Sequence, residues 1–154
     1  MYKFSDKTVC IGISACVLDQ PVRYDGSHKR SRFCTDTLAG QIEFLPLCPE
    51  MALDLGVPRP TIRLEQYENR IIAKSKDGVD LTERLHNYGK LMAKQLDNLS
   101  GYIFCAKSPS CGVERVEIYS SNDQPSPTGT GLYAQAIMTA LPLLPVEEND
   151  RLHD

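Results

Sequence analysis

The sequence VCIGISAC, residues 9–16, is an apolar run that ends in a cysteine, and it decides the fold class. Its small and β-branched residues are typical of a strand buried on both faces of a parallel sheet. Two later stretches are similar: EFLPLC ends at Cys48, and YIFCAK is followed by Cys111 in KSPSCG. Because ligands bind beyond the carboxyl ends of parallel strands, we expect Cys16, Cys48 and Cys111 to meet in one crevice.

Strand and helix patterns alternate along the rest of the chain. The clearest helix begins near Asp80, where Asp80 and Glu83 resemble a capping box, and apolar residues then recur every three or four positions up to Leu99. The other expected elements are strands at 43–47, 102–106 and 143–146, a hairpin of 61–64 with 70–73, helices at 32–41, 51–55 and 129–141, and a polar loop at 19–31. This alternation predicts one α/β domain over residues 1–154, with a three-layer, Rossmann-like, mainly parallel sheet and helices on both faces.

The bulk composition favours a small cytoplasmic protein. The chain has 154 residues, a net charge of −3 and no apolar run of membrane-spanning length. Its beginning, MYKFSDKTV, lacks the apolar core of a signal peptide, so we expect a compartment in which thiols stay reduced. The six cysteines are therefore interpreted as ligands, nucleophiles or buried apolar residues, and not as a disulfide framework.

The cysteine trio allows two interpretations. Three thiolates in one crevice would form a metal site that leaves one position free for chemistry. The alternative is that they are small buried apolar residues, and the absence of a CxxC pair leaves this open. Cys10 and Cys105 lie inside expected strands and are interpreted as buried apolar residues. Iron–sulfur clusters are usually held by four cysteines, so a fourth ligand could come from Cys34 or from a non-cysteine group. Whether Cys34 is a ligand or a buried residue is left open.

Two short motifs place polar side chains beside these cysteines. In Cys48-Pro49-Glu50, the carboxylate would act as a general acid or base, or would stabilise the start of the next helical turn. In SPSCG, proline and glycine favour a tight loop. Its serines, Ser108 and Ser110, would hydrogen-bond a substrate or only the local backbone.

The loop PVRYDGSHKR, residues 21–30, is rich in basic groups. These could hold a phosphate, and its tyrosine could stack on a base, but a solvated charged loop fits the composition equally well. The candidate substrate-binding residues in this loop are Arg23, Tyr24, Asp25, His28, Lys29 and Arg30. A second candidate anion site, GTG at 129–131, opens a helix but lacks the lysine and spacing of a P-loop.

Three of these stretches together carry a family resemblance. ISACVLDQPVRYDG, LCPEMALDLGVPRP and KSPSCG resemble the bacterial thiouracil desulfurase family, and GTGLYAQAI…LPLLPVEENDRL fits its usual ending. The resemblance covers essentially the whole chain in the right order. One departure is VLDQ, which replaces the commoner leucine–glycine after the first cysteine; it affects the geometry of the loop and removes no ligand.

The resemblance implies an oxygen-sensitive [4Fe–4S] cluster bound by Cys16, Cys48 and Cys111, with the fourth iron free of protein ligand. It also implies a non-redox desulfuration, in which the open iron takes up the sulfur of a thiocarbonyl, water replaces it at carbon, and hydrosulfide leaves. The acid/base glutamate of the family falls on Glu50, and its assisting serine falls on Ser108.

We therefore expect a desulfurase of thiolated pyrimidines that acts on free thiouracil or a nucleotide such as 4-thiouridine monophosphate. The stretch 23–32 would bind the phosphate, Ser110 would contact the substrate, and the chain would be a monomer or weak homodimer without membrane contact. Two alternatives remain open. One is desulfuration of thiouridine in transfer RNA, which the net charge and the lack of the extra domain of larger relatives disfavour. The other is a non-enzymatic binding module with a structural zinc site.

Overall fold

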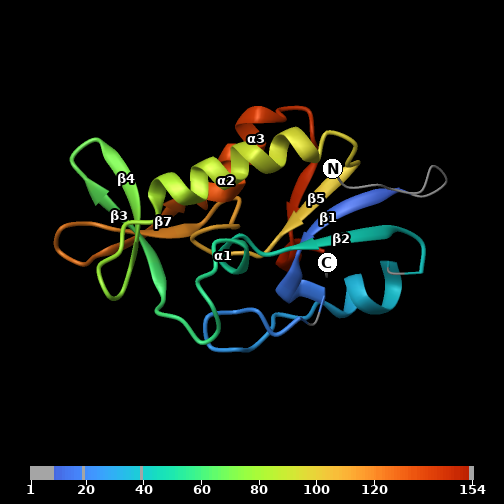
Figure 1. Cartoon of the computed structure of the whole chain (residues 1–154), viewed down its shortest axis with the longest axis horizontal. Coiled ribbons are helices and arrows are strands. Elements are labelled where there is room, and N and C mark those ends of the chain that lie inside the picture. Colours follow the sequence, from blue (N-terminus) through green and yellow to red (C-terminus); the bar gives the residue numbers. More distant parts are fainter. Residues whose placement is uncertain (1–8, 19, 39, 153–154) are drawn as a thin grey trace.

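A computed structural model of the chain describes residues 9–18, 20–38 and 40–152 and contains two four-stranded sheets (Figure 1). The first sheet has the strand order β2-β1-β5-β8, and all of its neighbouring strands run parallel. Its strands are β1 (Cys10–Ser14), β2 (Glu43–Leu47), β5 (Gly101–Phe104) and β8 (Val146–Glu148). The expected parallel sheet is confirmed.

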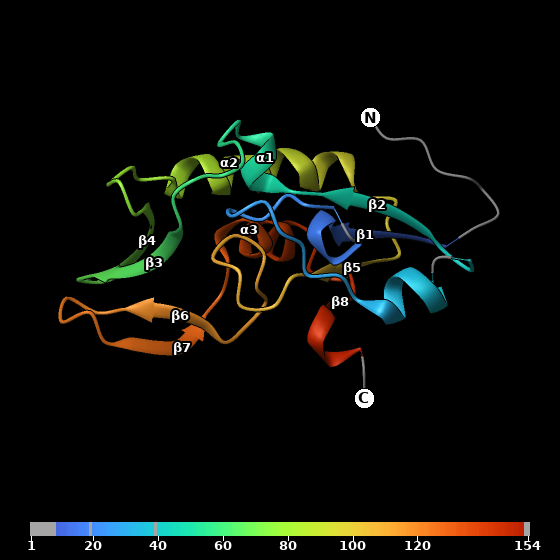
Figure 2. The same cartoon turned by 90° about the horizontal axis from the view of Figure 1, so that it is seen from below.

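Helical segments cover both faces of this sheet, which completes the three layers of the predicted α/β fold (Figures 1 and 2). Two long helices, α2 (Thr82–Gln95) and α3 (Leu132–Ala140), pack against one another on one face. The short turn η1 (Ala15–Leu18) and the π-helix η2 (Phe33–Leu38) lie on the other. None of the helices in the described part of the chain combines the length and apolar composition that a membrane span requires.

Aromatic packing fixes α3 onto the parallel sheet. The rings of Tyr102 and Phe104 on β5 stack with their centroids 4.0 Å apart, and the Tyr102 and Tyr133 hydroxyls lie 3.0 Å apart in the core. Gly12 on β1 makes room for these rings, since a Cβ there would come within 2.8 Å of Tyr102. Burial of these large side chains stabilises the fold through the apolar surface they remove from water.

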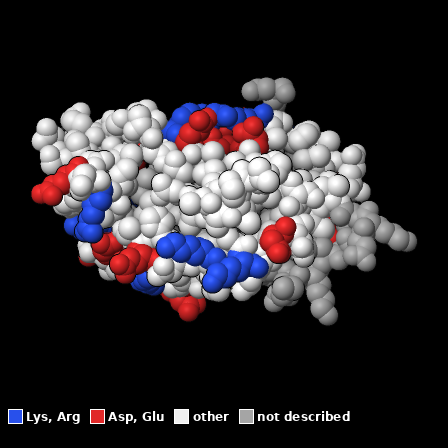
Figure 3. Space-filling view, turned by 90° about the horizontal axis from the view of Figure 1, so that it is seen from above, with Lys and Arg blue, Asp and Glu red and all other residues white. Residues whose placement is uncertain are grey.

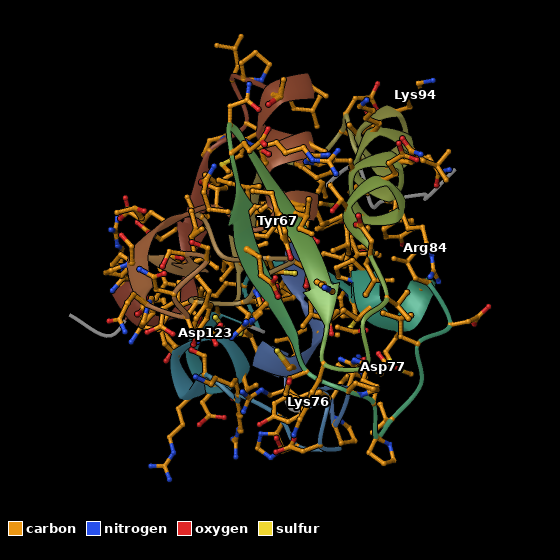
Figure 4. The ribbon with its side chains drawn as sticks, turned by 90° about the vertical axis from the view of Figure 1, so that its left-hand side faces the viewer. Tyr67, Lys76, Asp77, Arg84, Lys94 and Asp123 are labelled. Carbon is orange, nitrogen blue, oxygen red and sulfur yellow. The ribbon has the colours of Figure 1, made fainter. Side chains whose placement is uncertain are left out.

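The second sheet has the order β4-β3-β6-β7 and extends from one end of the molecule (Figure 2). Its strands are β3 (Ile62–Tyr67), β4 (Arg70–Ser75), β6 (Val116–Tyr119) and β7 (Pro125–Gly129). The hairpin expected from the sequence is β3–β4, seen from the sheet's end in Figure 4 with Tyr67 exposed at its tip. The sequence analysis missed β6 and β7. Strand β7 is PSPTG and lacks the residues that mark a strand, whereas β6, VEIY, has them but is only four residues long.

Several boundaries differ from the prediction: the strand expected at 143–146 is β8, which starts only at Val146, and the helix expected at 129–141 is α3, which starts at Leu132. Helix α2 starts at Thr82 after Leu81, so Asp80 does not cap it; instead Oδ1 of Asp80 accepts the N–H of Thr82 at 2.9 Å. The helix expected at 51–55 is α1 (Pro49–Ala52). Strand β5 ends at Phe104, so Cys105 lies beyond the strand rather than inside it. This last difference changes the composition of the site.

Candidate active site

The carboxyl ends of β1, β2 and β5 surround a cavity of about 200 Å³. Cys16, Cys48 and Cys111 all line it, which brings together residues nearly a hundred positions apart in the chain. Cys16 lies in η1 directly after β1, and Cys48 directly follows β2. Cys111 belongs to the loop after β5. The convergence expected from the strand ends is therefore present.

These three thiols are removed from water. Cys111 is 5% exposed and Cys16 is 9% exposed, whereas Cys48 is partly buried. A hydrogen bond with Cys105, together with burial, raises the pKa of the Cys16 thiol. Burial also raises the pKa of Cys48 and of Cys111. In the metal-free chain these side chains are neutral thiols, so metal binding has to release their protons.

The donor set fits a multi-iron cluster better than a single metal ion. Among the described residues, no three His, Cys, Asp or Glu side chains lie close enough together to hold one ion. A zinc ion requires its ligands at roughly 2.0–2.3 Å from one centre. In an iron–sulfur cube each thiolate binds a different iron, so the ligands stand farther apart around a larger space. Three soft thiols on separate walls of one cavity match this second arrangement.

A fourth thiol, Cys105, lines the same cavity and is 7% exposed. The hydroxyl of Ser14 accepts the backbone N–H of Cys105 at 2.9 Å, which holds the start of this loop against the end of β1. The expected placement of Cys105 inside the strand was wrong because β5 ends at Phe104, but its expected burial is confirmed, since it belongs to the hydrophobic core cluster. Cys34, considered as a further ligand, is completely buried in η2 and is not among the residues that line the cavity.

Glu50 lies in the first turn of α1, beside Cys48, and lines the cavity. The hydroxyl of Ser110 donates a hydrogen bond to its Oε2 at 2.7 Å. Nε of Arg59 donates to its Oε1 at 2.9 Å. Both carboxylate oxygens therefore have a fixed partner, and the carboxylate is held at the edge of the cavity.

Arg59 is a site residue that the sequence analysis missed. Its side chain is only 4% exposed, and it donates to the carbonyl oxygens of Gly56 and Val22, each at 2.7 Å. Its own N–H donates to the carbonyl of Tyr24 at 2.8 Å. Arg59 thus connects α1 to the loop that carries the candidate substrate-binding residues. The only sequence feature that could have indicated Arg59 is its position between two prolines, and this pattern is equally typical of a solvated turn.

The two serines of SPSCG have different partners. The hydroxyl of Ser108 accepts the N–H of Cys111 at 3.0 Å and that of Ser110 at 3.2 Å, so it shapes the loop. The hydroxyl of Ser110, in contrast, reaches Glu50. Ser108 nevertheless lines the cavity and stands 3.2 Å from the Ser110 hydroxyl.

Helix α3 supports this loop from behind and does not offer an anion site. The N–H groups of Gly131, Leu132 and Ala134 donate to carbonyls of the 109–112 segment at 2.7, 3.1 and 3.0 Å. The suggestion that GTG cradles an anion is therefore wrong, because the loop already occupies these donors. A Cβ at position 131 would lie 2.5 Å from the carbonyl carbon of Ser110, so only glycine allows this close approach.

The candidate substrate loop divides into two groups. Arg23, Tyr24 and Lys29 line the cavity, and the Arg23 guanidinium lies 5.8 Å from the centre of the Tyr24 ring. The remaining candidates do not line it. Asp25 accepts hydrogen bonds from Ser27, His28 Nδ1 accepts the N–H of Arg30, and the Arg30 side chain pairs with Asp36 at 2.8 Å.

Comparison with known proteins gives two matches over most of the chain. A family model described as 2-thiouracil desulfurase matches residues 11–149. A solved structure described as the [4Fe–4S]-dependent thiouracil desulfidase TudS is similar with a TM-score of 0.73 and 29% identity, covering 94% of this chain and 93% of that chain. No protein with a curated description matches the sequence.

Proposed function

The chain belongs to the 2-thiouracil desulfurase family, and on this premise we propose that it replaces the sulfur of a thiolated pyrimidine by oxygen at the cavity described above, with a [4Fe–4S] cluster as cofactor. One observation carries the proposal: three cysteines and a doubly hydrogen-bonded glutamate line the same cavity. The similar solved structure is that of a [4Fe–4S]-dependent enzyme, which supports the choice of cofactor.

Cys16, Cys48 and Cys111 would hold the cluster. When bound, it supplies a Lewis-acidic iron with affinity for soft sulfur and without a protein ligand. Burial of Cys16 and Cys111, and partial burial of Cys48, protects the proposed ligands from competing water. Most polar groups of the cavity come from α1, Arg59, the SPSCG loop and the 20–30 loop.

Glu50 is the proposed general base. Water adds through its oxygen to the thiocarbonyl carbon while Glu50 accepts one of its protons. The protonated Glu50 then gives this proton to the departing sulfur as the carbon–sulfur bond breaks, so that hydrosulfide leaves, and the remaining hydroxyl proton passes to the Glu50 carboxylate as the carbonyl forms. Arg59 and Ser110 keep the carboxylate oriented, because each donates to a different oxygen of it.

The loop serines would share the assisting role. The family resemblance assigns it to Ser108, whose hydroxyl holds the N–H of the proposed ligand Cys111. Ser110 donates a hydrogen bond directly to Glu50, so of the two serines it is the better placed to exchange a proton with the carboxylate. We assign Ser108 to loop and ligand positioning and Ser110 to contact with Glu50 and the substrate.

The substrate proposed for this cavity is a thiouracil base or its nucleotide. Tyr24 is 39% exposed and offers a ring for stacking on a pyrimidine, while Arg23 and Lys29 can receive a phosphate. The transfer RNA alternative has less support. The net charge of −3 disfavours it, and on the face shown in Figure 3 the described lysines and arginines lie next to acidic residues.

The test is anaerobic reconstitution with iron and sulfide, followed by incubation with 2- and 4-thiouracil and with their nucleotides. We expect loss of the thiocarbonyl absorbance together with release of hydrosulfide. If the reconstituted protein binds iron but converts none of these compounds, the proposed reaction is wrong. Zinc in place of iron in the purified protein would instead support the binding-module alternative.

Phosphate recognition is tested separately. Arg23→Ala and Lys29→Ala should raise KM for the nucleotide and leave KM for the free base unchanged. Arg30→Ala is the matched control, because its guanidinium pairs with Asp36 and does not line the cavity. Equal effects of all three substitutions on base and nucleotide would argue against a phosphate site in this loop.

A further inference from the structure

The Cys105 thiol has no part in the proposed desulfuration, although it lies in the wall of the same cavity. The Cys105 side chain lines the cavity together with that of Cys16, one of the proposed cluster ligands, and the two thiols interact electrostatically. Both residues are reduced in the structure, and each is less than a tenth exposed. Two thiols are thus held together at the end of the parallel sheet.

The backbone explains why these two cysteines form a pair. They follow β1 and β5, which are neighbours in the sheet with Ile13 opposite Ile103. The hydrogen bond from the Cys105 N–H to the Ser14 hydroxyl continues this pairing beyond the strand ends. Cys48 comes from β2, which is not adjacent to β5, so it is less suited to reach Cys105.

We propose that Cys16 and Cys105 are an oxidative modification site, at which peroxide converts the cluster-free chain to an intramolecular disulfide. One thiol attacks hydrogen peroxide, which yields a sulfenic acid and one water molecule. The other thiol attacks the sulfenic sulfur, forms the S–S bond and releases a second water. Two thiols and one peroxide therefore give one disulfide and two waters, and the peroxide is the two-electron oxidant.

This modification has a consequence for the proposed cofactor. Since the thiolate is the form that binds metal, a Cys16 sulfur in a disulfide cannot hold iron. Thiols can reduce the disulfide back to two cysteines, whereas further oxidation of Cys16 to a sulfinic acid is irreversible in most proteins. Formation of the disulfide therefore protects Cys16 from irreversible oxidation. Only this consequence rests on the proposed function; formation of the disulfide does not.

The experiment starts from the full chain, freed of metal by a chelator and fully reduced without oxygen. After treatment with hydrogen peroxide, free thiols are alkylated and the protein is digested without reductant for mass spectrometry. We expect a linked peptide pair that contains Cys16 and Cys105, with the loss of two of the six free thiols. Absence of this pair, or a dominant link through Cys48 or Cys111, would overturn the proposal.

Variants supply the controls and an independent readout. Cys34→Ala removes a buried cysteine outside the cavity and should retain the link. Cys105→Ala and the near-isosteric Cys105→Ser should lack it and show Cys16 with two added oxygens.

After reduction with dithiothreitol and reconstitution, the wild type should regain its iron content, while both Cys105 variants should not. Equal recovery of iron by all proteins would contradict the protective role. If the link forms but no reduced protein binds iron, the modification site is supported and the proposed cofactor is not.

Discussion

Arg59 donates its Nε–H to Oε1 of Glu50 at 2.9 Å, so an almost fully buried cation holds the carboxylate proposed as general base. The other guanidinium nitrogens donate to the carbonyls of Gly56 and Val22. One side chain therefore sets the position of the carboxylate and fixes the neighbouring loop. Loss of this side chain should affect both stability and turnover.

Arg59→Ala should destabilise the protein by about 3–5 kcal/mol, because removing one partner of a buried ion pair leaves the other charge uncompensated. Turnover should fall while the iron content of the folded protein is retained. Denaturant unfolding, iron analysis and steady-state kinetics check these outcomes. The control is Arg63→Ala, because the Arg63 side chain is 43% exposed and each of its ion pairs, with Glu65 and with Asp123, should contribute less than about 1 kcal/mol. Equal losses in the two variants would contradict the structural role of Arg59.

Glu50→Gln should retain the cluster and lose turnover by roughly 10²–10⁴-fold, the usual contribution of a general base. The amide is similar in size and can still accept from Arg59, so the fold should be unaffected. Visible absorbance reports the cluster, and hydrosulfide release reports turnover. Glu117→Gln, an exposed position on β6, is the matched control. Normal turnover of Glu50→Gln would rule out its catalytic role.

Replacement of Cys16, Cys48 or Cys111 by alanine should each prevent stable cluster assembly, because a thiolate ligand is lost. Iron and sulfide analysis after anaerobic reconstitution measures this directly. Cys34→Ala should reconstitute normally, since that cysteine does not line the cavity. Full iron content in any of the three cavity variants would remove that residue from the proposed ligand set.

Gly131→Ala should lower iron binding without touching a ligand. The added methyl group would lie 2.5 Å from the carbonyl carbon of Ser110 and 2.7 Å from the N of Cys111, so the loop has to shift. Reconstituted iron content and the unfolding midpoint should both fall. Gly40→Ala, where nothing lies within 4 Å of the new carbon, should leave both unchanged. Unaltered iron binding in Gly131→Ala would show that Cys111 tolerates displacement.

Asp80 should make the stability of α2 depend on pH. Hydrogen bonds from Thr82 lower the pKa of Asp80 below its ordinary value of 3.8. A pKa that is lower in the folded than in the unfolded chain stabilises the protein above pH 3.8, and this contribution is lost as the pH falls through the folded value. Asp80→Ala removes the hydrogen bond from Thr82 and should therefore cost roughly 0.5–1 kcal/mol at neutral pH and less in acid, as measured by urea unfolding. A penalty that stays constant in acid would contradict this assignment.

Much of the architecture could be predicted because the spacing of apolar residues along a short stretch shows whether that stretch forms a strand or a helix. The run before Cys16 and the stripe of α2 each identify an element without any knowledge of its neighbours. Strand β7 could not be found in this way, because PSPTG has no strand pattern and pairs only because β6 lies beside it. Tertiary pairing there overrides local preference.

The site was predicted in part for the same reason. Cys16, Cys48 and Cys111 follow strand ends, and parallel strands bring such positions to one edge of the sheet. Cys105 was assigned to the core alone because the sequence does not show that β5 ends one residue before it, which lets this buried side chain also line the cavity. Arg59 was missed because its partners Glu50 and Val22 lie 9 and 37 positions away, and no local pattern connects them to it.

The sequence by itself determined the order of the main elements and the family, since both depend on local patterns and short motifs along the chain. Only the tertiary structure decided which loop residues face the cavity and which serine contacts Glu50. Those contacts join residues up to 60 positions apart, and their geometry is set by how the segments pack rather than by the residues next to them.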